Sequence, residues 1–410
     1  MPHARLVVTG TEVLEGRVRD ENGAAIAADL TARGVRVLGT SVVDDALGSI
    51  EGAVADALGS GAALVVVTGG LGPTHDDRTM EAVARAAGVE LREDAEALGR
   101  IEAAMSGVRV RASAQVRAAA ARKQALVPAG ATSLPPPGTA PGAVLPVGAQ
   151  TVVVLPGPPW ECMASWDHAL ATPRMGELLA STGGAPITLR LAGVVESEFI
   201  EAIADPRWHE GIEVGVCAKP GELEVVIRPA DAAGRALEAH LDAAFPGAIF
   251  SRDGARLEQV LGQALRDAGA TLSTAESCTG GMIGARITGV AGSSAWYQGG
   301  VVSYDDAVKR EVLGVPAEVL ASHGAVSAEC AAAMATGCRD RLGTTWALSV
   351  TGIAGPGGGT AEKPVGLVYV GLAGPDGVAT RELHLHGDRE RVRQRAATIA
   401  LHMVREAVTG

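Results

Sequence analysis

A short segment, residues 273–281 (STAESCTGG), combines the residue types that acyl-transfer chemistry uses. Ser277 lies between an apolar run and a helical pattern, and Gly280 and Gly281 follow it closely. A serine hydroxyl is a weak nucleophile and needs a neighbouring base. The backbone amides of residues 278–281 come at a helix start, where they are expected to be free to bind an anion or an oxyanion. The segment predicts either a nucleophilic serine or a helix cap.

The candidate base lies in the segment SYDDAVK, where Lys309 follows Tyr304 by about one helical turn. A lysine removed from water can be uncharged and accept a serine proton, with a tyrosine as relay. The chain has only four lysines, at positions 123, 219, 309 and 363, among 35 basic residues. The chain thus strongly prefers arginine to lysine, and each of the four lysines is present either by chance or because it has a function. The alternative to a Ser–Lys pair is a capping Ser277 with a surface Lys309.

A second glycine-rich segment, TGIAGPGGGTAEKPVG, covers residues 351–366. Such a backbone can form a nest for phosphate or carboxylate, although a long structural turn would use the same residues. The segment lacks the Lys-Ser/Thr ending of a P-loop, which excludes that type of nucleoside triphosphate site. Arg389 and Arg393, one turn apart on a predicted helix, either clamp a phosphate or face solvent.

In the first part of the chain, the segment TGGLGPTHDDRT combines a glycine loop with Asp76, Asp77 and Thr79. Adjacent carboxylates and a hydroxyl suit a divalent metal that also binds phosphate oxygens. Aspartate at a helix start is equally consistent with ordinary capping.

The elements that position these residues follow an α/β pattern. Apolar strands alternate with helices in residues 1–170, which predicts a parallel sheet with helices on both faces. Ligands bind beyond the carboxyl ends of such strands, where the polar loops fall. The Pro/Gly-rich residues 128–150 are interpreted as a loop inside this domain. Residues 171–253 predict a small α+β domain, and the α/β pattern starts again in residues 254–410.

Composition excludes several classes of protein. The net charge is −12 and aromatic residues are 3%, so neither a basic stripe nor a stacking platform for nucleic acid is visible. The five scattered cysteines form no C-x-x-C pair, which argues against a disulfide framework and a structural zinc site. No apolar run approaches the roughly 20 residues of a membrane helix. We expect a cytoplasmic protein that binds neither membrane nor nucleic acid directly.

The C-terminal motifs occur together in one order: TAESCTGG, GSSAWYQGGVVSYDDAVK, HGAVS, TGIAGPGGG…EKPVG and GDRERVR. In this respect the chain resembles the bacterial CinA (competence/damage-inducible) proteins over essentially its full length. Residues 254–410 resemble their nicotinamide mononucleotide (NMN) deamidase domain. Through GTEVLEG, TGGLGPTHDD, GTAPG and LPGPP, residues 1–170 resemble molybdopterin-binding-type domains. The middle domain corresponds to a small KH-like domain.

The resemblance implies that Ser277 is the nucleophile and that Lys309 and Tyr304 activate it. NMN would be converted to nicotinic acid mononucleotide and ammonia in pyridine nucleotide salvage, without a cofactor, by a protein that is a homodimer. The residues implied to bind this substrate are Thr279, Gly280, Gly281, Thr351, Gly352, Gly355, Gly357, Gly358 and Arg393.

The resemblance also implies an ADP-ribose pyrophosphatase site with a divalent metal, held by Asp76 and Asp77. Its nucleotide pocket would comprise Thr11, Glu12, Asn22, Gly69, Gly70, Gly72, Asp76, Gly138 and Thr139. Two asparagines usual in the family are replaced in RAAAARKQA and LPPPGTAPG, so we expect this second activity to be weak or absent. In SYDDAVK, Asp306 stands where asparagine is usual. A non-enzymatic accessory role in competence or DNA damage is the remaining alternative.

Overall fold

The computed structural model describes residues 2–106 and 113–410. Internal contacts divide the chain into two units, Met1–Pro186 and Ile187–Gly410. The first unit extends past residue 170 because Met175 of helix α8 (Pro173–Ala180) is buried in the same core as Trp166. Within the described ranges, no helix combines the length and the apolar character that crossing a bilayer requires.

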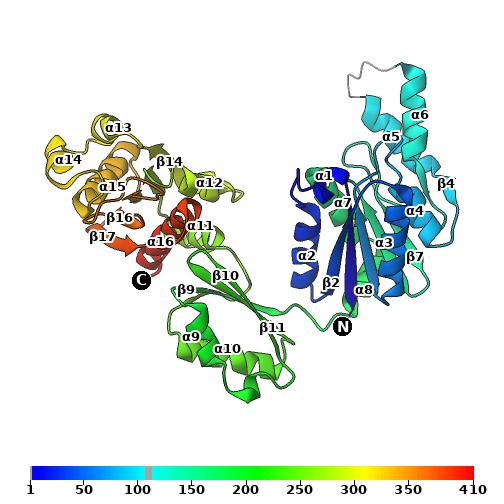
Figure 1. The fold of residues 1–410 in the computed structure, drawn as a ribbon, viewed down its shortest axis with the longest axis horizontal. Coiled ribbons are helices and arrows are strands. Elements are labelled where there is room, and N and C mark those ends of the chain that lie inside the picture. The colour runs from blue at the N-terminus through cyan, green and yellow to red at the C-terminus, as the bar shows by residue number, and fades with distance from the viewer. Residues whose placement is uncertain (1, 107–112) are drawn as a thin grey trace. The chain divides into compact units, whose positions relative to one another are not determined.

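The first unit is an α/β domain with a six-stranded sheet in the order β2-β1-β3-β8-β7-β6 (Figure 1). Strands β2, β1, β3 and β8 are parallel, which confirms the predicted parallel sheet. Strand β7 is antiparallel to β8, and the edge strand β6 is antiparallel to β7. Helices α3 and α4 cover one face, and α2, α7 and α8 cover the other. The elements are β1 (His3–Thr9), α1 (Thr11–Leu14), α2 (Asn22–Ala32), β2 (Arg36–Val43), α3 (Leu47–Gly59), β3 (Leu64–Thr68), α4 (Thr79–Ala86), β4 (Leu91–Glu93), α5 (Ala95–Ser106), α6 (Ala114–Gln124), β5 (Leu126–Pro128), β6 (Thr132–Ser133), β7 (Ala143–Val147), β8 (Gln150–Leu155), α7 (Pro159–Leu170) and α8.

The Pro/Gly-rich residues 128–150 contain more structure than the expected loop. Strands β6 and β7 pair with each other, and β7 pairs with β8 through a tight turn at Gly148. Proline does not prevent this pairing because Pro146 lies near the end of β7, where one missing amide breaks little of the ladder.

The second unit begins with a small α+β module, residues 187–251. Its antiparallel sheet has the order β10-β11-β9-β12, and Phe199, Leu237 and Leu241 pack two helices on one face. The elements are β9 (Ile187–Ala192), α9 (Glu196–Ala202), the 3-10 helix η1 (Pro206–Trp208), β10 (Glu213–Lys219), β11 (Glu222–Arg228), α10 (Ala232–Ala244) and β12 (Ile249–Ser251).

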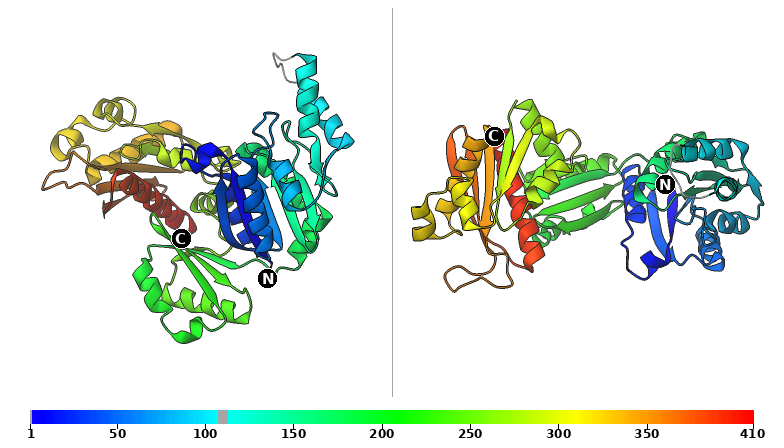
Figure 2. Two further views of the ribbon diagram at one scale, coloured as in Figure 1. Left: turned by 45° about the vertical axis from the view of Figure 1, so that its right-hand side comes forward. Right: turned by 90° about the horizontal axis from the view of Figure 1, so that it is seen from above.

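The rest of the second unit is an α/β fold on a five-stranded sheet of order β14-β13-β15-β16-β17. Helices α11, α12 and α16 pack on one face of this sheet, and α15 packs on the other. The two views in Figure 2 show α16, in red, lying along the sheet. The elements are α11 (Leu257–Asp267), β13 (Leu272–Glu276), α12 (Met282–Thr288), the 3-10 helix η2 (Ser293–Ala295), β14 (Tyr297–Val302), α13 (Asp306–Glu311), α14 (Ala317–His323), α15 (Ala328–Leu342), β15 (Trp346–Gly352), β16 (Leu367–Gly374), β17 (Gly377–His384) and α16 (Arg389–Thr409).

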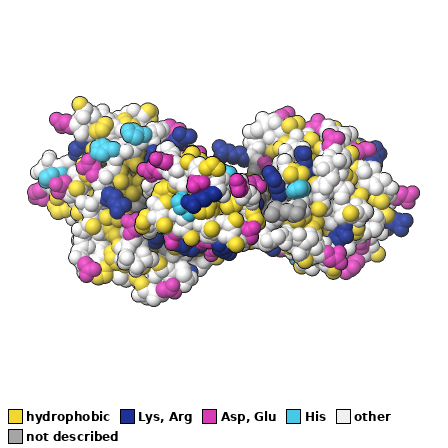
Figure 3. Space-filling model, turned by 90° about the horizontal axis from the view of Figure 1, so that it is seen from below, with side chains coloured by type: hydrophobic (Ala, Val, Ile, Leu, Met, Phe, Trp, Pro, Cys, Tyr) yellow, Lys and Arg dark blue, Asp and Glu magenta, His cyan; other side chains and the backbone are white. Residues whose placement is uncertain are grey.

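Strands β14, β13 and β15 are parallel, so their carboxyl ends meet at one edge of the sheet. The Ser277 segment, the SYDDAVK segment and the second glycine loop each follow one of these three strands. Charged side chains of both signs are interspersed on the face shown in Figure 3, and those drawn there form no continuous basic stripe.

Candidate active site

The carboxyl edge of the second unit's sheet brings Ser277 beside two other strand ends. The Ser277 amide donates to the Val350 carbonyl at 2.9 Å, and the Ser303 amide donates to the Glu276 carbonyl at 2.8 Å. Ser277 is 8% exposed, and its neighbours Thr279 and Ser303 are fully buried. The predicted nucleophile is therefore largely closed to water.

Ser277 does not cap the helix that follows it. Helix α12 has Gly281 as its N-cap, and no side chain hydrogen-bonds at that position. The buried carboxylate of Glu276 instead accepts hydrogen bonds from the amides of Gly281 (3.0 Å), Ile283 (3.0 Å) and Gly284 (2.8 Å). An anion at these amides neutralises the positive end of the helix.

This carboxylate changes the expected anion site. The Gly281 amide is occupied by Glu276, and the Gly280 amide donates to the Ser277 carbonyl at 3.0 Å. The expectation that all four amides of 278–281 are free was therefore wrong. In the described part of the chain, the amides of Cys278 and Thr279 donate to no backbone oxygen. The Thr279 hydroxyl is also buried without a partner.

Lys309 is buried rather than on the surface, with 1% exposure. Its Nζ donates to the Tyr304 carbonyl at 3.4 Å and to Asp306 Oδ1 at 3.1 Å. The amine that we expected to be uncharged thus forms an ion pair. Among the described residues, no hydrogen bond joins Nζ to the Ser277 hydroxyl. Lys309 lies on helix α13, and its Nζ reaches the carbonyl of Tyr304, the residue after Ser303. Because the Ser303 amide binds the Glu276 carbonyl, this contact follows the strand that pairs with the strand before Ser277.

Tyr304 is oriented differently from a buried proton relay. It is 61% exposed, and its hydroxyl accepts a hydrogen bond from Arg389 Nη2 at 3.0 Å. Arg389 Nη1 also donates to the Gly355 carbonyl at 2.7 Å. Arg389 therefore links the tyrosine to the second glycine loop.

Arg393 holds the loop that carries Ser277. Its Nε donates to the Cys278 carbonyl at 3.2 Å and its Nη2 to the Thr279 carbonyl at 2.9 Å, while Nη1 contacts Glu390 at 3.0 Å. The guanidinium that we expected to bind the substrate phosphate thus donates its hydrogen bonds to backbone carbonyl oxygens. This arrangement makes Arg393 a positioning residue for residues 278–279.

The second glycine loop is anchored at both ends. The Thr351 hydroxyl donates to the Ala325 carbonyl at 2.7 Å, and Lys363 Nζ donates to the carbonyls of His323 (2.6 Å) and Val326 (2.7 Å). Gly352 lies so close to the Leu367 carbonyl that a side chain would collide with it. Between these anchors, Gly357 and Gly358 are exposed while Gly355 is buried.

Cys278 is not a competing nucleophile. Burial raises the pKa of its thiol from 9.0 to about 12, so the reactive thiolate is disfavoured near neutral pH.

In the first unit, a cavity of about 450 Å³ brings together most of the predicted nucleotide pocket. Among its lining residues are Glu12, Asn22, Gly69, Gly70, Asp76 and Asp77. Asn22 Nδ2 donates to Thr68 Oγ1 (3.0 Å) and to the Gly157 carbonyl (2.7 Å), whereas its Oδ1 is buried without a partner. An unpaired buried acceptor is costly, so a ligand donor is a suitable partner for it.

The remaining pocket residues lie outside this cavity. Thr11 donates to Asp45 through both its amide (2.9 Å) and its hydroxyl (2.8 Å), and Asp45 lines the cavity. Gly72 lines a neighbouring cavity of about 430 Å³. Gly138 and Thr139 line neither of the two.

The proposed metal ligands Asp76 and Asp77 are held by Thr74. The Thr74 hydroxyl donates to both carboxylates, and its amide donates to Asp77 Oδ2 at 2.8 Å. The hydroxyl lowers the pKa of the exposed Asp76 carboxyl, which keeps it ionised. Within residues 2–106 and 113–410, no three His, Cys, Asp or Glu side chains form a cluster that could hold a metal alone. A metal here would need ligands from water or phosphate.

Comparisons with known proteins identify the family of the chain. Residues 254–408 match the family described as the CinA C-terminal domain, and residues 5–176 match a probable molybdopterin binding domain. A CinA-like protein of Mycolicibacterium vanbaalenii is 45% identical over 420 residues, which cover 99% of each chain. The chain belongs to the CinA family.

A second relative matches nearly the whole chain, and a solved structure matches part of it. A CinA-like protein of a Mycobacterium species (strain MCS) is 44% identical over 417 residues, covering 99% of this chain and 98% of that one. The solved structure of a competence/damage-inducible protein from Agrobacterium tumefaciens is 42% identical, with a TM-score of 0.37, and covers 38% of this chain and 94% of that chain.

In this CinA family member, sequence reasoning missed several site residues. Glu276 was overlooked because its carboxylate acts on the amides of residues beyond the glycine turn. Asp45 and Lys123 approach the first unit's cavities from separate elements, and Lys123 Nζ is buried there without a partner. The scarcity of lysine was the one sequence signal that pointed to Lys123.

Proposed function

We propose that residues 254–410 hydrolyse the carboxamide of NMN, giving nicotinic acid mononucleotide and ammonia in pyridine nucleotide salvage. The observation that carries the proposal is a shielded Ser277 at the end of β13, with the buried Lys309 on helix α13, which follows the adjacent strand β14. A serine, an amine and backbone amides that bind no backbone oxygen are parts that amide hydrolysis can use.

In the first step, Ser277 Oγ attacks the carboxamide carbon, and its proton passes to a base. The tetrahedral oxyanion is stabilised by the amides of Cys278 and Thr279, whose donors are unused by the backbone. Collapse breaks the C–N bond, and the proton goes to the leaving nitrogen as ammonia forms. An ester on Ser277 remains.

In the second step, water attacks this ester and releases the carboxylate product. Lys309 can act as the base only when its amine accepts a proton instead of donating a hydrogen bond to Asp306. The alternative is that the charged ammonium orients the substrate or stabilises the oxyanion.

Substrate entry depends on the loops above the serine. Ser277 and Lys309 are nearly closed off from solvent, whereas Gly357 and Gly358 are exposed on the second glycine loop. We infer that this exposed segment moves to admit NMN, and that Arg389, at its base, is available to the phosphate.

The test is to incubate the full chain with NMN, measure ammonia and nicotinic acid mononucleotide, and repeat this with S277A and C278A. S277A should lose at least about 10³-fold of the rate, because nothing replaces the hydroxyl. C278A serves as the control, because its protonated thiol has no chemical role. Equal activity of S277A and the unsubstituted chain would refute the proposal, as would loss of activity in C278A alone.

A second candidate function is metal-dependent hydrolysis of ADP-ribose by residues 1–170. The unpaired Asn22 Oδ1 and the adjacent carboxylates of Asp76 and Asp77, all in one cavity, favour it. The two Thr74-bound carboxylates would hold the divalent cation, which would neutralise phosphate charge. The missing asparagines lead us to expect only a weak activity.

A further inference from the structure

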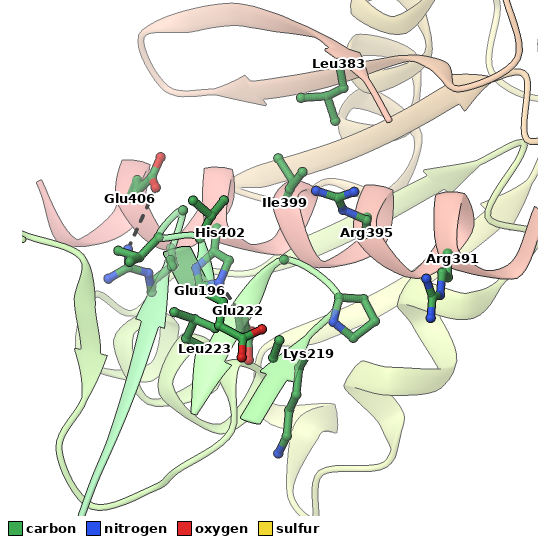
Figure 4. Close-up of a pocket in the computed structure, with 18 of the residues that line it drawn as sticks. Glu196, Lys219, Glu222, Leu223, Leu383, Arg391, Arg395, Ile399, His402 and Glu406 are labelled. Carbon is green, nitrogen blue, oxygen red and sulfur yellow. Dashed lines mark ion pairs between the residues drawn. The ribbon is translucent and has the colours of Figure 1, made fainter. Parts of the chain in front are cut away.

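We propose that this protein has a third binding site, for a small nucleoside phosphate, between the α+β module and helix α16. A cavity of about 670 Å³ lies there, within the second unit and lined by neither Ser277 nor Lys309 (Figure 4). This volume is in the range of about 300–1,000 Å³ that is typical of small-molecule sites.

The walls of the cavity are fixed to one another. Phe250 of the module belongs to the same hydrophobic core as Leu401 and Val404 of α16. The module's turn at Gly221 is so close to α16 that a Cβ there would lie 3.0 Å from Thr398 Cγ2. The cavity is therefore a preformed feature of a packed junction.

The cavity is basic in a protein that is acidic overall. Lys219, Arg381, Arg391, Arg395 and Arg405 line it, against three carboxylates, those of Glu196, Glu222 and Glu406. Three of the cations are paired with acids: Lys219 with Glu224, and Arg381 and Arg405 with Glu406.

Two arginines remain without an acidic partner. Among the described residues, neither Arg391 nor Arg395 takes part in an ion pair, and Arg395 Nη1 contacts only the His386 carbonyl, at 3.4 Å. The two residues are four apart on α16 and so lie on neighbouring turns of the helix, from which their side chains point in different directions in Figure 4. A pair of guanidinium groups at this spacing suits a phosphate.

Two buried polar side chains at the other end of the cavity pair only with each other. His402 is 4% exposed, and its Nε2 lies 3.3 Å from Glu222 Oε1, an ion pair when the imidazole is protonated. Neither ring nitrogen of His402, nor this Glu222 oxygen, has a hydrogen bond. Buried polar groups without hydrogen bonds are costly, and both side chains line the cavity, so a ligand hydroxyl or ring nitrogen beside the pair would reduce the cost.

The cavity also has an apolar wall, made by Val194, Leu223, Leu383 and Ile399. A ligand that fits all three regions has a phosphate, a flat apolar ring and polar ring or sugar atoms. A mononucleotide has this combination, whereas inorganic phosphate would use only the arginine pair.

The experiment is calorimetric titration of the full chain with AMP, with adenosine and inorganic phosphate as the other probes. The variants are R391A/R395A, H402Q and, as the matched control, R266A, which removes an exposed arginine outside the cavity. Thermal unfolding of each variant checks that it is folded.

We expect the unsubstituted chain and R266A to bind AMP, phosphate to bind more weakly, and adenosine not to bind measurably. R391A/R395A should lose one site per chain or bind it at least about tenfold more weakly, because a bidentate contact is removed. H402Q should weaken the binding of AMP but leave the binding of phosphate unchanged. An unchanged number of AMP sites with unchanged affinity in R391A/R395A would place the site elsewhere and overturn the proposal, as would no binding to the unsubstituted chain. Single-stranded RNA that competes for these arginines with higher affinity than AMP would overturn the ligand class.

Discussion

The two candidate catalytic regions of this CinA family member differ in how far their side chains are exposed to water. Around Ser277, the candidate nucleophile and Lys309 are buried, Tyr304 is exposed, and the loop is held by Glu276 and Arg393. In the first unit, Asp76 is exposed and Asp77 is only half-buried. Proton transfer between a serine and an amine gains from exclusion of water, whereas a hydrated cation with phosphate tolerates exposure. The contrast indicates two different chemistries rather than two versions of one.

The largest effect that tests this contrast is expected at Lys309. Replacement by methionine should lower ammonia release from NMN by about 10³-fold, because general-base catalysis contributes on this order. K309R keeps the charge but cannot act as a base, so it should be equally inactive when Lys309 is the base. The measurement is kcat for both variants. Activity of K309R within about tenfold of the unsubstituted chain would assign Lys309 the role of a charged clamp.

The next effect concerns the loop that Arg393 holds. R393A should lower kcat by about 10²-fold, because small displacements of a nucleophile have effects of this size. KM for NMN should change less, since Arg393 contacts the carbonyls of Cys278 and Thr279. R266A is the control. A large rise in KM with unchanged kcat would instead show that Arg393 binds the phosphate.

Hydrolysis of ADP-ribose at the exposed site of the first unit should depend on a divalent metal and not on Ser277. Weak hydrolysis of ADP-ribose by the full chain should require Mg²⁺ or Mn²⁺, and D77N should reduce it at least about tenfold, as loss of a ligand does. D56N, an exposed aspartate on α3, is the control. Chelation should leave NMN hydrolysis unaffected. A common loss of both activities on chelation would contradict the separation of the two sites.

The smallest expected effect is on the pH dependence of stability, and it follows from the burial of Cys278. The Cys278 thiol has its pKa raised from 9.0 to about 12 by burial, so only the unfolded chain loses this proton near pH 10. This group therefore favours unfolding as the pH rises from 9 toward 12, by about 1.4 kcal/mol at pH 10. Urea unfolding at pH 7.5 and pH 10 should show C278A losing less stability than the unsubstituted chain, by about that amount. Equal losses would mean that the thiol is accessible.

Sequence reasoning located the reactive segments but not their contacts. The parallel strands and the loops after them could be predicted because apolar periodicity and glycines report local structure. The pairing of Lys309 with Asp306 and the use of the Gly281 amide by Glu276 could not be predicted, since side-chain direction at a turn depends on the packed structure. For the same reason Arg393, expected to bind phosphate, was found on carbonyl oxygens.

Helix α16 has 21 residues and so extends about 30 Å. Its first turns hold the Ser277 loop through Arg393, and its later turns pack on Phe250. A fragment that starts after Phe250 would lose this one contact, while α11, α12 and the sheet would still cover the apolar side of the helix. The core around α16 is thus built mostly from residues after Phe250, so such a shortened protein should keep the contact between Arg393 and the Ser277 loop.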